Sequence, residues 1–410
     1  MKNKIKEAEV KGIYMDHNAT TAVHPEAMEA MLPFFSEHFG NPSSIHWAGR
    51  EVKKGIESAR ESVASFLRCD PKEIVFTAGG SESNNLAIKG VCEALKEKGN
   101  HIIATKVEHP AVLHTCEYME KQGFQVTYLP VDMDGMISLD DLRNAITDKT
   151  ILITIMFANN ETGTIFPIAE IGKIAKEKRI TFHTDAVQAA GKIALDVNAL
   201  NVDLLTISAH KLYGPKGVGA LYVRKGAKIK PLIHGGGQER NRRAGTENVT
   251  GIVGMGKACE IAMRDIDVES ERVLKLRERL HKGLTQKIEH VKLNGHPTMR
   301  LNNTLNVSFE YVEGESLLLN LDMDGVAASS GSACSSGSLE PSHVLTAMGL
   351  PHEVAHGSVR FSLGRSNREE DVDKIIEIMP PVVERLRAMS PLYGKSLNPQ
   401  VERTTAVCHH

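Results

Sequence analysis

The stretch VDLLTISAHKLYGPKGVG, residues 202–219, decides how the rest of the chain is interpreted. Its apolar, β-branched first half predicts a buried strand, and the Gly-Pro-Lys-Gly turn that follows prevents this strand from continuing. Lys211 is therefore expected at a strand end, where α/β proteins usually present the side chains that act on ligands. Most lysines are solvated surface residues. A chemical role for this amine consequently needs support from other segments.

Length and composition predict an ordinary globular protein. The chain has 410 residues, enough for two or three domains, and its hydrophobic content of 41% is sufficient for a sizeable core. Its 49 basic and 51 acidic residues nearly balance, so no strong field favours nucleic acid or an anionic membrane. A small neutral or zwitterionic ligand fits this balance better.

The chain carries no evident export or membrane signal. The lysines near its start are not followed by the apolar core of a secretory signal, and no apolar run approaches the roughly 20 residues that span a bilayer. We expect a cytoplasmic protein. The six cysteines are widely spaced, so neither a disulfide framework nor a structural metal site is expected; they are Cys69, Cys92, Cys116, Cys259, Cys334 and Cys408.

Strands and helices are expected to alternate through the first half of the chain. This alternation predicts a parallel sheet covered by helices. The expected strands are residues 73–77, 101–105, 124–129, 151–158 and 180–188. The expected helices are residues 51–67, 110–122, 139–146 and 168–178, with a further long helix that follows residues 78–83 and ends near Lys98.

The segment AGGSES, residues 78–83, joins a predicted strand to a long predicted helix. Its two glycines allow close backbone approach, and the amides at a helix N-terminus favour an anion such as phosphate. The Ser81 hydroxyl can add to this cradle. The alternative is a tight turn in which Ser81 is a plain N-cap. Neither the dinucleotide nor the P-loop glycine pattern is present.

Other polar side chains also follow predicted strands. His109 lies just past the strand 101–105, Asn160 follows the apolar run 151–158, and Asp185 is followed closely by Gln188. Each has an ordinary explanation, such as a surface histidine or a capping aspartate. Together with Lys211 and the anion cradle, they provide what pyridoxal phosphate requires: phosphate donors, a carboxylate for the pyridine nitrogen and an amine for a Schiff base.

Six segments together closely resemble the cysteine desulfurases, which are class V aminotransferase relatives of the NifS and IscS type. The resemblance implies a pyridoxal phosphate enzyme of the aspartate aminotransferase fold, and it extends from about Tyr14 to the helix after Arg365. The segments are HTDAVQ (183–188), SAHKLYGPKGVGALYVR (208–224), HGGGQER (234–240), AGTEN (244–248), SSGSACSSGS (329–338) and SVRFSLGR (358–365).

The resemblance implies a role for each strand-end residue. Lys211 would form the Schiff base, and Asp185 would pair with the pyridine nitrogen. Gln188 and Asn160 would be donors near the phenolic oxygen, and Asn160 would also contact the substrate. His109 would stack on the cofactor, and because imidazole titrates near working pH we expect it to move protons during the reaction.

The phosphate and the substrate carboxylate have implied contacts of their own. Thr246 would reach the phosphate from the other subunit of a dimer, and Arg360 would bind the carboxylate as a bidentate fork. Gln238 replaces a histidine common in its loop, so that contact is not carried over. Four residues of the same chain would hold the phosphate: Gly80, Ser208, His210 and Ser81, which stands where relatives often have threonine.

Cys334 is the residue that would decide the reaction. Its surroundings are almost entirely serine, glycine and alanine, a composition typical of a flexible linker. A thiol in such a loop is poorly suited to core packing and well suited to carrying sulfur. The expected reaction converts L-cysteine to L-alanine and leaves a persulfide on Cys334. No metal is expected in the resting enzyme, with Cys334 as a transient contact to an iron–sulfur cluster.

We predict a large cofactor domain at residues 18–258 and a smaller α/β domain formed by residues 1–17 and 259–390, followed by a tail at 391–410, expected to be flexible. The resemblance also implies a homodimer and an iron–sulfur scaffold protein as sulfur acceptor. In the smaller domain the expected strands are residues 305–309 and 358–363, and the expected helices are residues 315–322 and 368–389.

Several other functions compete with this interpretation. An aminotransferase or β-lyase would use the same cofactor site without Cys334, and a selenocysteine lyase would differ only in the chalcogen. A scaffold binding metal or an iron–sulfur cluster through cysteines is disfavoured by their spacing. A serine hydrolase is suggested by HGGG at 234–237, but the chain contains no G-x-S-x-G segment.

Overall fold

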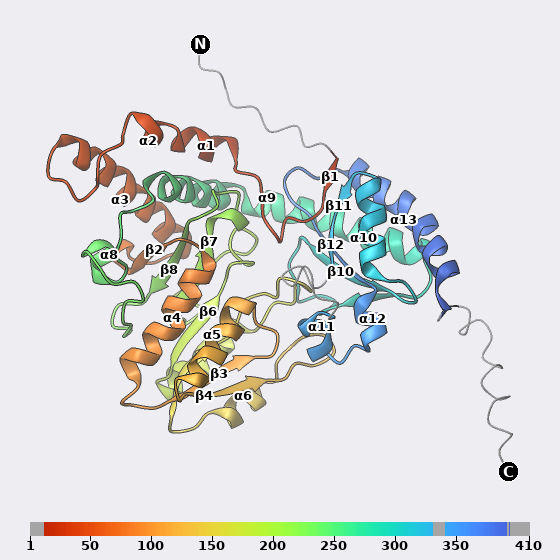
Figure 1. Ribbon diagram of the computed structural model, residues 1–410, viewed down its shortest axis with the longest axis horizontal. Coiled ribbons are helices and arrows are strands. Elements are labelled where there is room, and N and C mark those ends of the chain that lie inside the picture. The colour runs from red at the N-terminus through yellow and green to blue at the C-terminus, as the bar shows by residue number, and fades with distance from the viewer. Residues whose placement is uncertain (1–11, 331–340, 392, 394–410) are drawn as a thin grey trace.

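The computed structural model describes residues 12–330, 341–391 and 393. Figure 1 shows a large sheet flanked by helices beside a smaller sheet with its own helices. The large sheet has seven strands in the order β2-β8-β7-β6-β5-β3-β4, and the smaller one has four in the order β12-β13-β10-β9. The mainly parallel sheet and the smaller α/β domain that the sequence predicts are both present.

Most strands of the large sheet run in the same direction, so their carboxyl ends lie at the same edge of the sheet. Strands β4, β3, β5, β6 and β7 pair in parallel, β8 is antiparallel to β7, and β2 is antiparallel to β8. Strand β2 therefore points the same way as β7. The bounds are β2 Ile74–Thr77, β3 His101–Thr105, β4 Gln125–Leu129, β5 Thr150–Thr154, β6 Thr181–Asp185, β7 Leu204–Ser208 and β8 Gly219–Val223.

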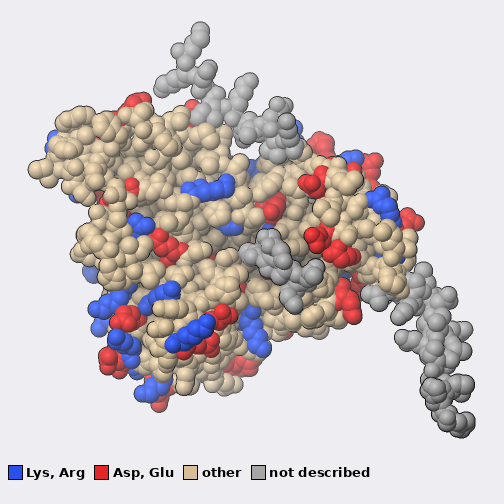
Figure 2. Space-filling model, viewed as in Figure 1, with Lys and Arg blue, Asp and Glu red and all other residues tan. Residues whose placement is uncertain are grey.

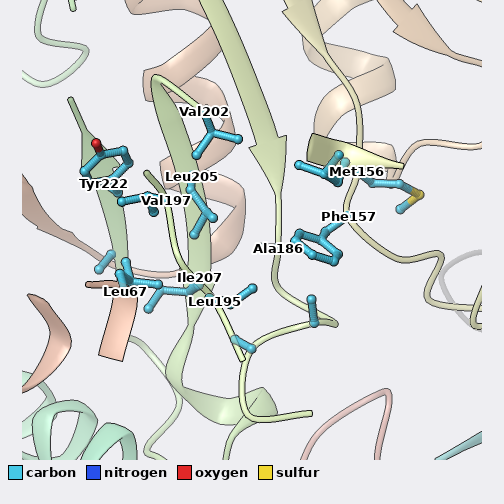
Figure 3. Close-up of a cluster of buried hydrophobic side chains, with 14 of the residues drawn as sticks. Leu67, Met156, Phe157, Ala186, Leu195, Val197, Val202, Leu205, Ile207 and Tyr222 are labelled. Atoms are coloured by element: carbon cyan, nitrogen blue, oxygen red, sulfur yellow. The ribbon is translucent and has the colours of Figure 1, made fainter. Parts of the chain in front are cut away.

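Both faces of this sheet are buried. Ile102 and Ile103 are neighbours in β3, yet they belong to two different core clusters, because successive side chains of a strand point to opposite faces. Strands covered on both sides read as continuous apolar runs, which is why the predicted strands lack alternation. Figure 3 shows part of one cluster, with Leu205 and Ile207 of β7 packed near Leu67 and Tyr222.

The covering helices come both before the first strand of the large sheet and between its strands. In α3 the buried residues Val52, Ile56, Ala59 and Val63 recur at helical spacing, so one face packs against the core. Around the large sheet lie α1 Pro25–Met31, α2 Pro33–Ser36, α3 Trp47–Leu67, α4 Gly80–Leu95, α5 Pro110–Lys121, α6 Leu139–Ala145, α7 Ile168–Lys178 and α8 Gln238–Asn241.

The smaller domain is built on an antiparallel sheet. Its strands are β9 Val291–Asn294, β10 Thr304–Phe309, β12 Ser329–Ser330 and β13 Ser358–Ser362, and β1 Ile13–Tyr14 pairs separately with β11 Val326–Ala327. Helices α10 Gly314–Met323 and α13 Glu369–Met389 pack in its core, whereas the buried residues of α11 His343–Ala347 and α12 His352–His356 belong to the core cluster of the large sheet. Within the described ranges, no helix combines the length and apolar character needed to cross a membrane.

Helix α9 (Val249–Lys287) passes through both hydrophobic cores. Ile252 and Met255 near its start pack in the core of the large sheet, whereas Leu276 and Leu280 further along pack in the core of the smaller domain. The predicted domain boundary at residue 258 therefore falls inside a continuous helix, and the division at that point stays a prediction.

Candidate active site

One cavity of about 300 Å³ lies at the carboxyl edge of the large sheet. All of its predicted residues except Arg360 come from the large domain, and Arg360 comes from β13 of the smaller domain. The predicted residues that line it are Gly80, Ser81, His109, Asn160, Asp185, Gln188, Ser208, His210, Lys211 and Arg360.

Lys211 reaches this cavity from a short 3-10 turn, Ala209–Lys211, directly after β7. Its Nζ donates hydrogen bonds to the backbone carbonyls of Asn18 and Ala19, the latter at 2.6 Å. The amine is thereby held at the cavity by the N-terminal segment. The sequence predicts the strand end but gives no sign of these two carbonyls.

Asp185 ends β6 and is only 6% exposed. Its Oδ2 accepts a hydrogen bond of 2.6 Å from Nδ2 of Asn84, and its Oδ1 accepts one of 3.0 Å from the amide of Val187. These donors fix the orientation of the carboxylate. Asn84 lies inside α4, so sequence reasoning missed it, and its Oδ1 is buried without a partner among the described residues.

The N-terminus of α4 forms one end of the cavity. Gly79 is its N-cap at φ +152, a conformation that favours glycine, and no side chain caps the helix. A Cβ on Gly80 would lie 3.0 Å from Cγ2 of Val187, so the backbone passes close to the wall. Because Gly79 is the N-cap, the alternative in which Ser81 is a plain N-cap is wrong. The exposed amides remain available to an anion.

His210 also borders this end of the cavity. Its Nδ1 lies 3.2 Å from Oγ1 of Thr20. Burial, and then the nearby positive charge of Lys211, lower the pKa of His210 to about 4. The ring is therefore neutral at ordinary pH, and it can contribute a hydrogen bond but no positive charge.

His109 is the N-cap of α5, where its Nδ1 accepts a hydrogen bond of 3.1 Å from the amide of Ala111. This contact leaves the ring proton on Nε2. Burial lowers the pKa of His109, the charge of Asp185 opposes that shift and the charge of Lys211 adds to it. The residue thus offers a neutral imidazole to the cavity.

Glu108 lies behind the cavity lining, next to His109 in the chain, and was not anticipated from the sequence. Its Oε1 accepts hydrogen bonds from Oγ1 of Thr105 at 2.8 Å and from the amide of Met156 at 3.0 Å, and Met156 lines the cavity. Its Oε2 is buried without a partner among the described residues. Burial raises the pKa of Glu108 to about 8, so this carboxyl is largely protonated near neutral pH.

Arg360 enters the cavity from the other domain with a side chain only 1% exposed. Its Nη2 forms an ion pair of 2.7 Å with Oδ1 of Asp16, and its Nη1 donates to the carbonyl of Asn160 at 2.9 Å. Its Nε is buried without a partner among the described residues. Asp16 is thus a site residue that the sequence analysis missed, because it precedes the first motif.

Among the predicted residues that the structure describes, Thr246 does not line this cavity. Thr246 is exposed and borders a separate hollow of about 80 Å³ beside Thr77 and Arg243. Cys334 lies outside the described residues, as does Cys408.

The four described thiols are enclosed to different degrees. Cys92, Cys116 and Cys259 are buried and Cys69 is partly buried. Burial raises the pKa of all four, to about 12 for Cys69 and Cys92. These thiols are therefore protonated at neutral pH and are poor nucleophiles.

The chemistry of the cavity fits pyridoxal phosphate. It combines an amine, a buried carboxylate, a neutral imidazole and uncapped amides at the start of a sixteen-residue helix. The orphaned Asn84 Oδ1 and Arg360 Nε leave polar groups for a bound molecule to satisfy. A phosphate suits the helix N-terminus, and a pyridinium nitrogen suits the carboxylate.

Comparison with known sequences places this geometry in context. The family model for class-V aminotransferases matches residues 13–375. A cysteine desulfurase IscS from Methanosarcina thermophila is 61% identical over 387 residues, which make up 94% of this chain and 96% of that protein. A cysteine desulfurase IscS from Clostridium botulinum (strain Hall) is 56% identical over 96% of this chain and 100% of that protein.

Solved structures with a similar fold include proteins of the same kind. A NifS-like protein superposes with a TM-score of 0.85 at 41% identity, covering 92% of this chain and 99% of that one. The structure described as SspA in complex with cysteine superposes with a TM-score of 0.78 at 42% identity, covering 86% of this chain and 99% of that one.

Proposed function

The chain belongs to the aminotransferase class-V family, its activity is that of a pyridoxal phosphate-dependent cysteine desulfurase, and from this premise we propose which residues perform each step. One observation supports the assignment above all others. Ten residues chosen from separate motifs line a single cavity of about 300 Å³. The relatives support this activity and give no support to the alternatives of a selenocysteine lyase or an ordinary aminotransferase.

The cofactor, when bound, supplies an aldehyde that holds the amine of L-cysteine and a ring that withdraws electrons from it. Lys211 would hold this aldehyde between turnovers, and its freed amine would accept the proton from the substrate Cα. Asp185, whose carboxylate is oriented by Asn84 and Val187, would hold the proton on the ring nitrogen. Gly80, Ser81, Ser208 and His210 would hold the phosphate.

Arg360 would bind the carboxylate of the substrate. Its guanidinium is held in place by Asp16 and the carbonyl of Asn160, so little side-chain freedom is lost when a second carboxylate arrives. His109 carries a proton on Nε2 beside the same cavity, which suits it to donate or accept a proton during the reaction.

Cys334 would remove the sulfur. Its thiolate attacks the sulfur of the substrate, a sulfur–sulfur bond forms, and the bond between sulfur and Cβ breaks with its electron pair left on carbon. A proton taken up at that carbon completes L-alanine, and the sulfur remains on Cys334 as a persulfide. One cysteine and one thiol thus give one alanine and one persulfide, without an external oxidant.

Replacement of Cys334 tests this assignment. We expect Cys334→Ala to retain the absorption of the bound cofactor but to form no alanine from L-cysteine with a reductant present. Cys69→Ala is the matched control, because it removes a partly buried thiol whose pKa is raised. Alanine formation by Cys334→Ala at the rate of the unmodified enzyme would show that the persulfide is carried elsewhere or not at all.

We also propose a homodimer in which Thr246 completes the cavity of the partner. Thr246 is exposed and does not line the cavity of its own chain. The segment from the end of α1 to the start of α3 exposes large apolar side chains that a second copy would cover. Figure 2 shows that this part of the surface is mostly uncharged, and its exposed apolar residues are Leu32, Phe35, Phe39, Ile45 and Trp47.

Subunit mixing tests the dimer directly. Lys211→Ala and Thr246→Ala should each be nearly inactive, and co-expression of the two should return partial activity. In the mixed dimer one cavity has Lys211 from one subunit and Thr246 from the other. Absence of recovery in a mixed dimer confirmed by mass spectrometry would contradict the shared site.

The last proposal concerns where the sulfur goes. We propose that the persulfide is passed to an iron–sulfur scaffold protein in the cytoplasm, with Cys334 as the transient contact. Labelled sulfur from L-cysteine should appear on a purified scaffold protein mixed with the enzyme. Transfer that is equally fast from Cys334→Ala would exclude this route.

A further inference from the structure

A second lysine lies close to Lys211. Lys192 and Lys211 both line a small chamber of about 50 Å³, next to the cavity already described. Lys192 follows β6 and comes four residues after Gln188. Although the residue as a whole is only partly buried, its ammonium lies deep among protein atoms.

The contacts of this ammonium are with one glutamine. Lys192 Nζ donates to the backbone carbonyl of Gln188 at 3.0 Å and to its side-chain Oε1 at 3.3 Å. Since an ammonium only donates, it fixes which end of the amide faces it. Gln188 Nε2 consequently points the other way, toward the cavity, where it donates to the carbonyl of Asn18 at 3.0 Å.

No carboxylate neutralises Lys192 within the part of the chain that the structure describes. Among the charged residues of the chamber, Glu269 pairs with Arg272 at 2.9 Å and Arg365 pairs with Asp265 at 2.8 Å. His17 also borders the chamber, and burial lowers its pKa to about 4, so it is neutral. The ammonium therefore remains without a counter-charge on this side.

A lysine in this position is costly for the fold. Burial, followed by repulsion from Lys211 and Arg360, lowers the pKa of Lys192 to about 7. A buried cation without an acidic partner is disfavoured, and perturbed groups of this kind gather at functional sites. A hydrocarbon side chain would fill the same space at lower cost, so the contact with Gln188 needs a reason.

We propose that Lys192 is a positioning residue that, through Gln188, aims an amide donor at the phenolic oxygen of the bound cofactor and, in its protonated form, places a positive charge beside Lys211. This inference rests on the proposed function and on the role that the family resemblance implies for Gln188, a donor near that oxygen. Lys192 does not line the cofactor cavity, so it acts through its neighbours rather than on the substrate.

Lys192→Met in the loaded enzyme tests the proposal. We expect kcat to fall about tenfold or more while KM changes less than about threefold, because the substrate carboxylate site is untouched. The midpoint of the pH titration of the cofactor absorbance should move upward by about one pH unit, because a repelling positive charge has been removed. Lys192→Arg should restore much of both values.

A double-mutant cycle with Gln188→Ala isolates the pathway. If Lys192 acts through Gln188, adding Lys192→Met to Gln188→Ala should lower kcat less than about twofold further. The exposed Lys178→Met is the control for loss of a lysine and should match the unmodified enzyme.

Two results would overturn the proposal. The first is that Lys192→Met lowers kcat equally in the unmodified enzyme and in Gln188→Ala. The second is that Lys192→Met leaves the titration midpoint unchanged but lowers the melting temperature, which is the result expected of a purely structural lysine. Should Lys192→Met not fold, Lys192→Gln carries the same measurements. An unmodified enzyme that made no alanine would instead refute the proposed function, so the two failures are distinct.

Discussion

The two ends of the cavity are built in different ways. The cofactor end, formed by Asp185, Lys211 and the N-terminus of α4, comes from neighbouring elements of one buried sheet. The substrate end, formed by Arg360 with Asp16 and Asn160, joins segments as far as 344 residues apart. The cofactor end should therefore tolerate little movement, whereas the geometry of the substrate end depends on how the two domains pack against each other. Substitutions at the two ends should therefore give different signatures.

Loss of the amine at the cofactor end should have the largest effect. Lys211→Ala should lower alanine formation about a thousandfold or more, since no other described amine contacts the carbonyls of Asn18 and Ala19. The purified variant should hold cofactor or substrate without turnover. An unchanged rate in the alanine assay would remove Lys211 from the mechanism.

At the substrate end, Arg360→Lys should raise KM for L-cysteine by about a hundredfold, because an ammonium cannot reproduce the guanidinium fork. The absorbance of the bound cofactor should stay unchanged, in contrast to any substitution at the cofactor end. Steady-state kinetics and an absorption spectrum check both points. A change in colour with normal KM would show that the two ends are not separable.

A smaller effect is expected from Asp16→Asn, which keeps the shape of the partner of Arg360 but removes its charge. The guanidinium should then be less firmly held, and KM should rise about tenfold. Glu310→Gln is a suitable control, since that carboxylate belongs to the smaller domain and does not line the cavity. A normal KM in Asp16→Asn would mean that the carbonyl of Asn160 alone positions Arg360.

The smallest effect concerns stability beneath the cofactor end. The pKa of Glu108 rises from 4.5 to about 8 on folding, so between these values the folded protein keeps a proton that the unfolded chain has lost. This carboxyl therefore makes stability fall as pH rises, by at most about 1.4 kcal/mol per pH unit. The free energy of unfolding of Glu108→Gln, measured in urea, should increase relative to that of the unmodified protein as the pH rises from 5.5 to 7.5. If the two free energies changed with pH in parallel, the raised pKa of Glu108 would be contradicted.

Much of the large domain could be predicted from sequence because its strands and helices have strong local signals. The strand 101–105 and the helix 168–178 match β3 and α7, and most other elements differ only at their ends. The run 151–158 is longer than β5, which ends at Thr154, although the amides of Ile155 and Phe157 still bond to the carbonyls of His183 and Asp185. Burial alone does not mark where a strand ends.

The residues that escaped prediction depend on distant partners. Asn84 meets Asp185 across 101 residues and Asp16 meets Arg360 across 344, so no local pattern marks either one. Lys192 lies in an ordinary sequence context, and only the fold reveals that its ammonium is enclosed. The reversal of β8 was also missed, because the turn after Lys211 indicates that a strand stops but not in which direction the next one runs.

The continuity of α9 has a consequence for how the protein comes apart. Its 39 residues extend for about 58 Å, and each hydrophobic core uses a different part of the same helix. Melting either core would strip half of that helix of its packing, so the two domains should lose structure together, in one cooperative heat-absorption peak. A fragment cut at residue 258 would divide the shared helix and is not expected to fold independently.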